Sequence, residues 1–329
     1  MITAPEPALY WTLFTIFASL IIGSIIRFIR LRGADEAKRH QRFASLRTWW
    51  MLAVGVSAAL LAGRPGICLL LAVASCSGWF EITRMLGARP EDRPAIQAGY
   101  GLIVINYLII LSGSVSFYVV FLPVSSLIVL AVLLLIKGEP RGYIRSAGGL
   151  LWGIMFLGYG VSHAALLLIL PESSTGPIGP AGWFLFLIIL TETNDIFQAQ
   201  VGRLSGSHKR HRITPVISPN KTWEGFLGGM LVTTVLALLI APSLTTLGQQ
   251  AGPLSLPDSL RPWIAPVFAA ILIALAGFFG DINMSAIKRD SGVKDSSNLL
   301  PGMGGVIDRI DSLTITAPVF VYFLIWWMA

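Results

Sequence analysis

The sequence has few charged residues, cysteines and histidines. Only 12% of its 329 residues are Asp, Glu, Lys or Arg, whereas 54% are hydrophobic, and soluble domains carry about a quarter charged residues. Cys68 and Cys76 lie in one apolar run, which predicts membrane packing and neither a disulfide nor a metal site. The four histidines have no zinc-like spacing. This composition excludes an ordinary soluble protein and predicts a membrane protein.

Several common signatures are also absent. The sequence contains no Walker A loop, no dinucleotide-binding glycine pattern after a strand and no Gly-x-Ser-x-Gly elbow. The first seven residues contain no Lys or Arg, whereas Arg27 and Arg30 follow the first apolar run. A secretory signal has its positive charge in front, so we expect this run to be a retained span. The net charge of +7 does not indicate nucleic acid, because the basic residues lie in short loops.

Apolar runs recur along the whole chain. A helix that crosses the hydrocarbon core needs about 20 residues, and we count ten candidate runs, at 9–28, 48–63, 66–83, 98–112, 115–136, 147–170, 179–195, 225–243, 263–281 and 313–328. Gly and Pro interrupt the pairs 48–83 and 98–136, so one span plus a re-entrant segment is the alternative for each pair. The sequence predicts an all-α polytopic integral membrane protein, with about six spans in region 1–175 and about four in a catalytic region 176–329.

The loop charges predict an orientation. All Lys and Arg residues except Arg64 and Arg261 lie in the first, third, fifth, seventh and ninth loops. Lys and Arg gather on the cytoplasmic side of short loops, so these loops are expected in the cytoplasm and both termini outside, in a bacterial inner membrane. The longest polar stretches, 196–224 and 282–312, then lie on the cytoplasmic face. We therefore expect the active site at the cytoplasmic interface of the C-terminal helices.

Three carboxylates are predicted to converge at this interface. Asp281 closes the ninth apolar run, and Asp308 and Asp311 precede the tenth. A helix would place Asp308 and Asp311 on one face, because they are three residues apart. Mg²⁺ is typically held by one or two carboxylates together with substrate phosphates. We therefore predict that Asp281, Asp308 and Asp311 bind a metal ion.

Basic residues and glycines accompany these acids. The stretch from Gly280 to Asp311 spans thirty-two residues and also contains Lys288, Arg289, Lys294, Arg309, Gly302, Gly304 and Gly305. Bases can hold phosphate, and glycines let a backbone approach it closely. The alternative is a juxtamembrane loop whose charges are solvated or paired. So many such residues in a sparsely charged chain favour chemistry on phosphate.

A second polar stretch lies upstream. Asp195 ends the seventh apolar run, and ionisable residues at membrane depth are usually functional, although an interfacial position is the alternative. The basic run 207–212 either attracts anionic lipid or contacts substrate. Hydroxyls and a Lys before a helix suit phosphate binding. The candidate substrate-binding residues of this stretch are Asp195, Arg203, Ser218, Lys221 and Thr222. Glu81, at the end of the third run, is a weaker candidate to line the same cavity or to cap a helix.

Together these stretches resemble the signature of the phosphatidate cytidylyltransferases, also called CDP-diacylglycerol synthases. The resemblance covers about 190–318. It rests on Asp195, Gly202-Arg203, Ser218-Pro219-Asn220-Lys221-Thr222-Trp223-Glu224-Gly225, Ser285-x-Ile287-Lys288-Arg289, Lys294-Asp295 and Leu300-Pro301-x-Met303-Gly304-Gly305-Val306-x-Asp308-Arg309-Ile310-Asp311.

The resemblance implies a reaction between CTP and phosphatidic acid that yields CDP-diacylglycerol and pyrophosphate. It implies Mg²⁺ held by Asp281 and Asp308, with a monovalent cation such as K⁺ beside it. In this interpretation Asp311 and Asp295 complete or support the metal site. Lys288, Arg289, Lys294, Lys221 and Arg309 neutralise phosphate, and Gly304 and Gly305 approach the substrate.

One departure from the family concerns Met303, where the family usually has His. A phosphate monoester has a second pKa of about 6, so the nucleophile is largely dianionic at pH 7 and needs no general base. Met303 therefore leaves the reaction intact and the choice of lipid phosphate open. The alternatives are a cytidylyltransferase for an ether or isoprenoid lipid phosphate, a polyprenol kinase, and an anion transporter, although no internal repeat favours transport. A homodimer is allowed, but no segment marks an interface.

Overall fold

A computed structural model describes residues 7–31, 36–136, 140–169, 176–206, 211–249, 252, 254 and 257–328. Within these ranges the chain is helical apart from one short hairpin and its connecting loops. Ser207 to Arg210 of the predicted basic run lie outside the described residues. The predicted all-α membrane class is confirmed.

The elements follow one another along the chain. The first group is α1 (Pro7–Arg30), α2 (Glu36–Leu61), α3 (Gly63–Met85), η1 (Pro90–Asp92), α4 (Arg93–Ser112), α5 (Val115–Ile136), α6 (Tyr143–Gly153), η2 (Ile154–Gly160) and α7 (Val161–Leu166). The second group is α8 (Pro180–Leu204), β1 (Arg212–Thr214), β2 (Ser218–Thr222), α9 (Trp223–Leu244), η4 (Leu247–Gln249), α10 (Arg261–Asp290), α11 (Ile307–Ile310) and α12 (Leu313–Met328).

The described ranges contain nine helices that are long and apolar enough to cross a membrane. Helix α8 is a further helix of 25 residues that is not among them. Its sequence changes from apolar to polar at Thr191-Glu192-Thr193-Asn194-Asp195, which lowers its hydropathy. Each of the ten predicted runs therefore lies mainly within a helix, and α8 carries the predicted site residue Asp195.

Each of the two pairs of apolar runs that Gly and Pro interrupt forms two separate helices. Residues 48–83 belong to α2 and α3, and residues 98–136 belong to α4 and α5. Gly63 begins α3 with a φ of 68°, and Gly113 ends α4 with a φ of 81°. Glycine adopts this left-handed conformation readily and so ends helices. Each of the four helices is long and apolar enough to cross a membrane, which disfavours the re-entrant alternative for both pairs.

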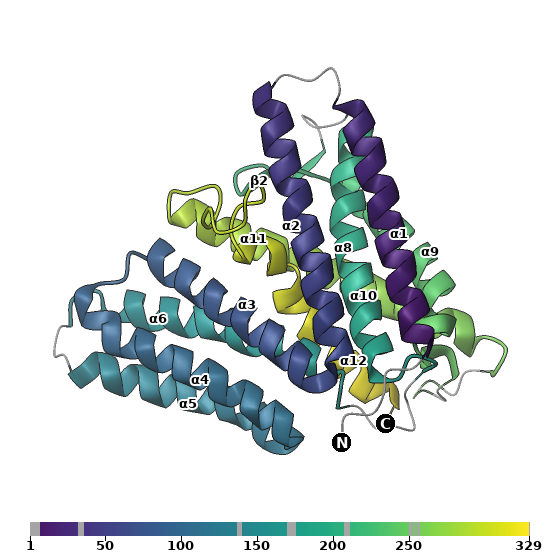
Figure 1. Cartoon of the computed structure of the whole chain (residues 1–329). Coiled ribbons are helices and arrows are strands. Elements are labelled where there is room, and N and C mark those ends of the chain that lie inside the picture. The colour runs from purple at the N-terminus through teal and green to yellow at the C-terminus, as the bar shows by residue number, and fades with distance from the viewer. Residues whose placement is uncertain are drawn as a thin grey trace.

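Helices α3, α4, α5 and α6 lie together at an angle to a group that contains α2, α8 and α10 (Figure 1). The two parts of the chain meet at α12, which packs against α7 and η2 as well as α10, while α3 contacts α11. The division into regions 1–175 and 176–329 remains a prediction. These contacts bring an N-terminal helix next to the C-terminal polar loop.

Small residues allow the C-terminal helices to approach closely. A Cβ atom added at Gly229 of α9 would lie 2.5 Å from Gln198 Cγ of α8. One added at Gly280 of α10 would lie 2.7 Å from the carbonyl oxygen of Asp311. Lipid tails are as apolar as the helix surfaces, so the hydrophobic effect does not drive helices together within a membrane. Their association depends instead on close packing of this kind. The polar residues of α8, α10 and α11 are thereby drawn together.

Candidate active site

Three carboxylates from three helical segments form what we call the acidic cluster: Asp195 of α8, Asp281 of α10 and Asp311, which follows α11. Their charges are close enough to interact. The hydroxyl of Ser312 donates to Asp195 Oδ2 over 2.6 Å. Asp195 Oδ1 is buried and has no hydrogen-bond partner within the described part of the chain. The structure therefore joins residues that are up to 116 positions apart in the sequence.

Lys221 places a positive charge at this cluster. Its Nζ lies 2.6 Å from Asp281 Oδ2 and donates to Gln198 Oε1 over 3.0 Å. Burial alone would lower the pKa of Lys221, but the charges of Asp281 and Asp195 outweigh burial and raise the pKa above its usual value. Lys221 is therefore a stable cation surrounded by carboxylates.

The position of Lys221 follows from its local structure. The hairpin pairs Arg212 with Thr222 and Thr214 with Ser218, so Lys221 lies near the end of β2. The Thr222 hydroxyl then accepts a hydrogen bond from Gly225 N over 3.2 Å and caps α9. Thr222 is thus used to start a helix, and Ser218 is half-buried in the strand. Of the predicted hydroxyl and lysine set, only Lys221 contacts the acidic cluster among the described residues.

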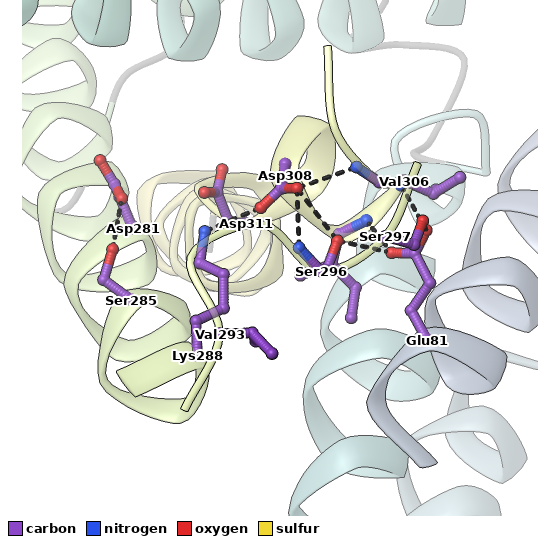
Figure 2. Close-up of polar contacts among 12 residues, drawn as sticks. Glu81, Asp281, Ser285, Lys288, Val293, Ser296, Ser297, Val306, Asp308 and Asp311 are labelled. Carbon is purple, nitrogen blue, oxygen red and sulfur yellow. Dashed lines mark hydrogen bonds and ion pairs between the residues drawn. The ribbon is translucent and has the colours of Figure 1, made fainter. Parts of the chain in front are cut away.

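Asp308 makes a separate set of contacts. Its Oδ1 accepts from Lys288 Nζ over 2.8 Å. Its Oδ2 accepts from Ser296 N and Ser296 Oγ, each over 3.1 Å, and from Gly305 N over 2.9 Å. An ionised carboxylate has about four acceptor positions, so protein donors use most of this capacity (Figure 2). The contacts favour a role in holding the loop over the predicted role as a metal ligand.

The loop that Asp308 binds spans residues 296–306, which we call the glycine loop. A tight turn closes it, with Leu300 N donating to the carbonyl of Gly304 over 2.9 Å. Gly304 has a φ of 83°. A Cβ atom at Gly305 would lie 2.0 Å from Ser296 Oγ. These glycines are therefore required by the loop's own geometry, and their predicted contact with substrate remains a prediction.

A carboxylate of α3 accepts hydrogen bonds from both ends of this loop. Glu81 is buried, and its carboxylate binds Ser296, Ser297, Val306 and Ile307. The sequence makes Glu81 a weaker candidate to line the cavity of the site or to cap a helix. Its partners are more than 200 residues away, and no local pattern indicates such a contact.

The remaining predicted residues lie at different distances from the cluster. Arg309 has a buried Nε with no hydrogen-bond partner in the described ranges, and its charge interacts with Glu192. Arg289 donates to the carbonyls of Ile217 and Val293, each over 3.3 Å, and so ties α10 to the hairpin. Three predicted residues are exposed, and no hydrogen bond or ion pair within the described ranges joins them to the acidic cluster: Arg203, Lys294 and Asp295.

The donor set can be tested for a metal ion. No three His, Cys, Asp or Glu side chains of the described residues are arranged to hold one. Mg²⁺ needs only one or two carboxylates when substrate phosphates supply further oxygens. Asp281 and the unpaired, buried Oδ1 of Asp195 are hard oxygen donors of this kind. The residues therefore fit an Mg²⁺ ion that binds together with a phosphate ligand.

Comparisons with known proteins agree with the sequence signature. Residues 43–327 match the family model described as "Cytidylyltransferase family". The "Uncharacterized protein YnbB" of Escherichia coli K12 is 36% identical over 95% of this chain and 97% of its own length. The phosphatidate cytidylyltransferase of Haemophilus influenzae is 41% identical over 42% of this chain and 44% of its own. That of Staphylococcus saprophyticus is 29% identical over 70% of this chain and 79% of its own.

Proposed function

Because the chain belongs to the cytidylyltransferase family and is a nucleotidyltransferase, we propose that it transfers the cytidylyl group of CTP to a lipid phosphate in the membrane. Phosphatidic acid is the first candidate acceptor, and the products would be CDP-diacylglycerol and pyrophosphate. The observation that carries the proposal is the acidic cluster around Lys221. It combines oxygen donors for a cation with a charged group for phosphate.

The proposed reaction exchanges one P–O bond for another. An oxygen of the lipid phosphate attacks the α-phosphorus of CTP, and the bond between the α-phosphorus and the bridging oxygen to the β-phosphorus breaks. Pyrophosphate leaves with the electron pair of that bond. The attacking phosphate is largely dianionic at pH 7, since its second pKa is about 6. The protein therefore needs to position and neutralise the reactants, and no side chain has to remove a proton.

The residues of the site would divide this work. Asp281 and Asp195, with Asp311 beside them, would hold Mg²⁺, which would neutralise phosphate charge when bound. Lys221 and Arg309 would bind phosphate oxygens, because both present cationic nitrogen at the acidic cluster or beside it. No contact among the described residues distinguishes a second ion, so the monovalent cation rests on the resemblance alone.

The membrane location of the site suits an acceptor that never leaves the bilayer. Asp195 and Asp281 belong to long helices, and the hairpin and glycine loop lie at the ends of these helices. We place these ends on the cytoplasmic face of a bacterial inner membrane, because the loops there carry the basic residues. CTP would then reach the cluster from the cytoplasm, while the lipid tails stay between the helices.

A second candidate is the same reaction on a different lipid phosphate. The match to the Haemophilus influenzae phosphatidate cytidylyltransferase covers less than half of either chain, whereas the match to YnbB covers nearly all of both. Met303 also replaces the family's usual His at the turn of the glycine loop. An ether-linked or isoprenoid phosphate is therefore the alternative acceptor. Family membership disfavours an anion transporter.

The test is turnover by the purified protein in mixed micelles. Labelled CTP is supplied with phosphatidic acid, an ether-linked analogue or a polyprenyl phosphate, with Mg²⁺ or with a chelator. CDP-lipid and pyrophosphate are both measured. We expect Mg²⁺-dependent formation of both products in equal amounts with phosphatidic acid. Product with another acceptor alone would support the second candidate. Absence of product with every acceptor, from protein shown to be folded, would refute the proposal.

A further inference from the structure

Glu81 is a buried acid of α3, and its hydrogen-bond partners among the described residues belong to the glycine loop and the start of α11. It is 1% exposed. Its Oε1 accepts from Ser297 Oγ over 2.6 Å and from Val306 N over 2.8 Å. Its Oε2 accepts from Ser296 Oγ and from Ile307 N, each over 2.9 Å. One carboxylate thus joins the beginning of the loop to its end (Figure 2).

These four hydrogen bonds also account for the presence of a buried carboxylate at this position. Glu81 forms no ion pair with a Lys or Arg among the described residues. An unpaired buried charge is strongly unfavourable unless hydrogen-bond donors surround it. Two of the donors are the backbone N–H groups of Val306 and Ile307 at the start of α11. The loop and the acid therefore depend on each other.

Part of the glycine loop borders a cavity and solvent. A cavity of about 510 Å³ lies between α3 and residues 293–299, and its lining includes Glu81, Arg84, Ser296 and Ser297. Asn298 and Leu299 are exposed. A Cβ atom at Gly305 would lie 2.5 Å from Glu81 Oε1, so the loop is fitted closely to the acid at its other end.

Glu81 is connected to the acidic cluster through this loop. The Ser296 hydroxyl lies within hydrogen-bond distance of both Glu81 Oε2 and Asp308 Oδ2, at 2.9 and 3.1 Å. Asp308 in turn binds Lys288 of α10. Asp311 follows Asp308 by one helical turn and belongs to the cluster. A shift of the loop would therefore move both Asp308 and the segment that carries Asp311.

We propose that Glu81 is a positioning residue of this active site, which holds the glycine loop and the start of α11 in the arrangement that the transfer reaction requires. The proposal rests on the proposed function. It assigns to an N-terminal helix a part in chemistry that the sequence places in the C-terminal region. Glu81 acts through the loop, so its loss should affect the rate of transfer more than the binding of CTP.

The first test is Glu81→Gln, which keeps the shape of the side chain. One acceptor oxygen becomes an NH₂ group that faces a donor, so at least one hydrogen bond is lost. We expect kcat to fall about ten- to hundredfold, because small misplacements of reacting groups have effects of this size. KM for CTP should change less than threefold, because Glu81 acts through the loop and its loss should affect CTP binding less than the rate. Glu81→Asp keeps all acceptor positions on a shorter side chain and should recover part of the lost kcat.

Asp92 provides the matched control. It is 2% exposed and, like Glu81, accepts hydrogen bonds from backbone and side-chain donors, in this case from Arg89 and Ser146. It has no contact with the glycine loop among the described residues. Asp92→Asn should therefore keep its kcat. Equal loss of kcat in Asp92→Asn and Glu81→Gln, in proportion to their lower melting temperatures, would overturn the proposal.

Hydrogen exchange gives a readout that does not depend on activity. In Glu81→Gln the amides of residues 304–307 should exchange at least tenfold faster than in the wild type, and in Asp92→Asn they should not. Unchanged exchange at these amides would overturn the proposal whether or not the wild type is active. A wild type that forms no CDP-lipid would instead refute the proposed function.

Ser297→Ala provides a variant that disturbs the fold less, in case Glu81→Gln does not fold. It removes one of the four donors, and we expect kcat to fall about two- to fivefold. Combined with Glu81→Gln, it should cause little further loss, because the two residues share one interaction. A wild-type kcat in Ser297→Ala together with unchanged exchange at residues 304–307 would count against the proposal.

Discussion

Replacing Asp281 by Asn perturbs the acidic cluster with almost no change in side-chain volume. Asp281 Oδ2 lies 2.6 Å from Lys221 Nζ, and the two side chains are 24% and 15% exposed. Removing one partner of a fully buried pair costs about 3–5 kcal/mol, and an exposed pair contributes about 0–1 kcal/mol. Here Asp195 remains close to Lys221, and repulsion among the acids falls. We therefore expect Asp281→Asn to lose about 1–2 kcal/mol of stability.

The expected effect on activity is much larger than the effect on stability. Asp281 would bind Mg²⁺ and keep Lys221 in place, and removal of one preorganised electrostatic group commonly lowers kcat about 10²- to 10³-fold. The assay measures initial rates of CDP-lipid formation over a range of Mg²⁺ concentrations, together with thermal unfolding. We expect Asp281→Asn to lower kcat by that factor and to require more Mg²⁺ for half-maximal rate.

Asp290 provides the control for this experiment. It is exposed at the last turn of α10, nine residues after Asp281, and belongs to no part of the proposed site. Asp290→Asn removes the same charge from the same helix and should keep its rate and its Mg²⁺ requirement. An Asp281→Asn protein with wild-type kcat and Mg²⁺ dependence would refute the reasoning, since the cluster would then be a structural feature only.

Three further predictions concern the loop and the topology. Gly305→Ala places a Cβ atom 2.0 Å from Ser296 Oγ, so it should lower stability by about 1–3 kcal/mol and reduce turnover more than tenfold; normal unfolding and turnover would contradict this. Asp308→Asn should speed amide exchange in residues 296–306 and lower kcat, and the Mg²⁺ concentration for half-maximal rate should stay the same. A higher Mg²⁺ requirement would instead support the prediction that Asp308 is a metal ligand. In a cysteine-free background, an impermeant maleimide should label Val216→Cys only from the cytoplasmic side and Asp258→Cys only from outside; labelling of both from one side would refute the topology.

Patterns confined to one element predicted the helices well. The apolar runs 48–63 and 66–83 lie within separate helices because Gly63 permits the conformation that divides them. Hydropathy reports local composition, and a transmembrane helix satisfies its backbone hydrogen bonds within itself. Such elements can therefore be read from the sequence without knowledge of their neighbours. Helix α8 is the exception in its hydropathy, because it contains the polar stretch 191–195.

Relations between elements were harder to predict. The spacing of Asp308 and Asp311 predicts one helix that carries both residues, but α11 has only four residues and ends before Asp311. Asp308 therefore binds the glycine loop, while Asp311 joins the cluster with Asp195 and Asp281. The spacing cannot show this division, because it depends on which donors the loop presents. The role of Glu81 was hidden for the same reason, since all four of its donors come from the other end of the chain.

The hydrogen bonds of these acids distinguish two kinds of role. Protein donors occupy most acceptor positions of Asp308 and Glu81, whereas several buried polar atoms of α8, α10 and α11 have no protein partner in the described part of the chain. Within the described ranges these atoms include Asp195 Oδ1, Gln198 Nε2, Asn283 Nδ2 and Arg309 Nε. An unsatisfied buried group costs about 1–3 kcal/mol, so a bound ligand or ordered water that satisfies these atoms would stabilise the protein. The set contains an anionic acceptor as well as donors, so a simple anion cannot satisfy all of it. A phosphate ligand that carries its own cation can pair with both kinds of atom, and the proposed substrate, CTP with Mg²⁺, has this composition.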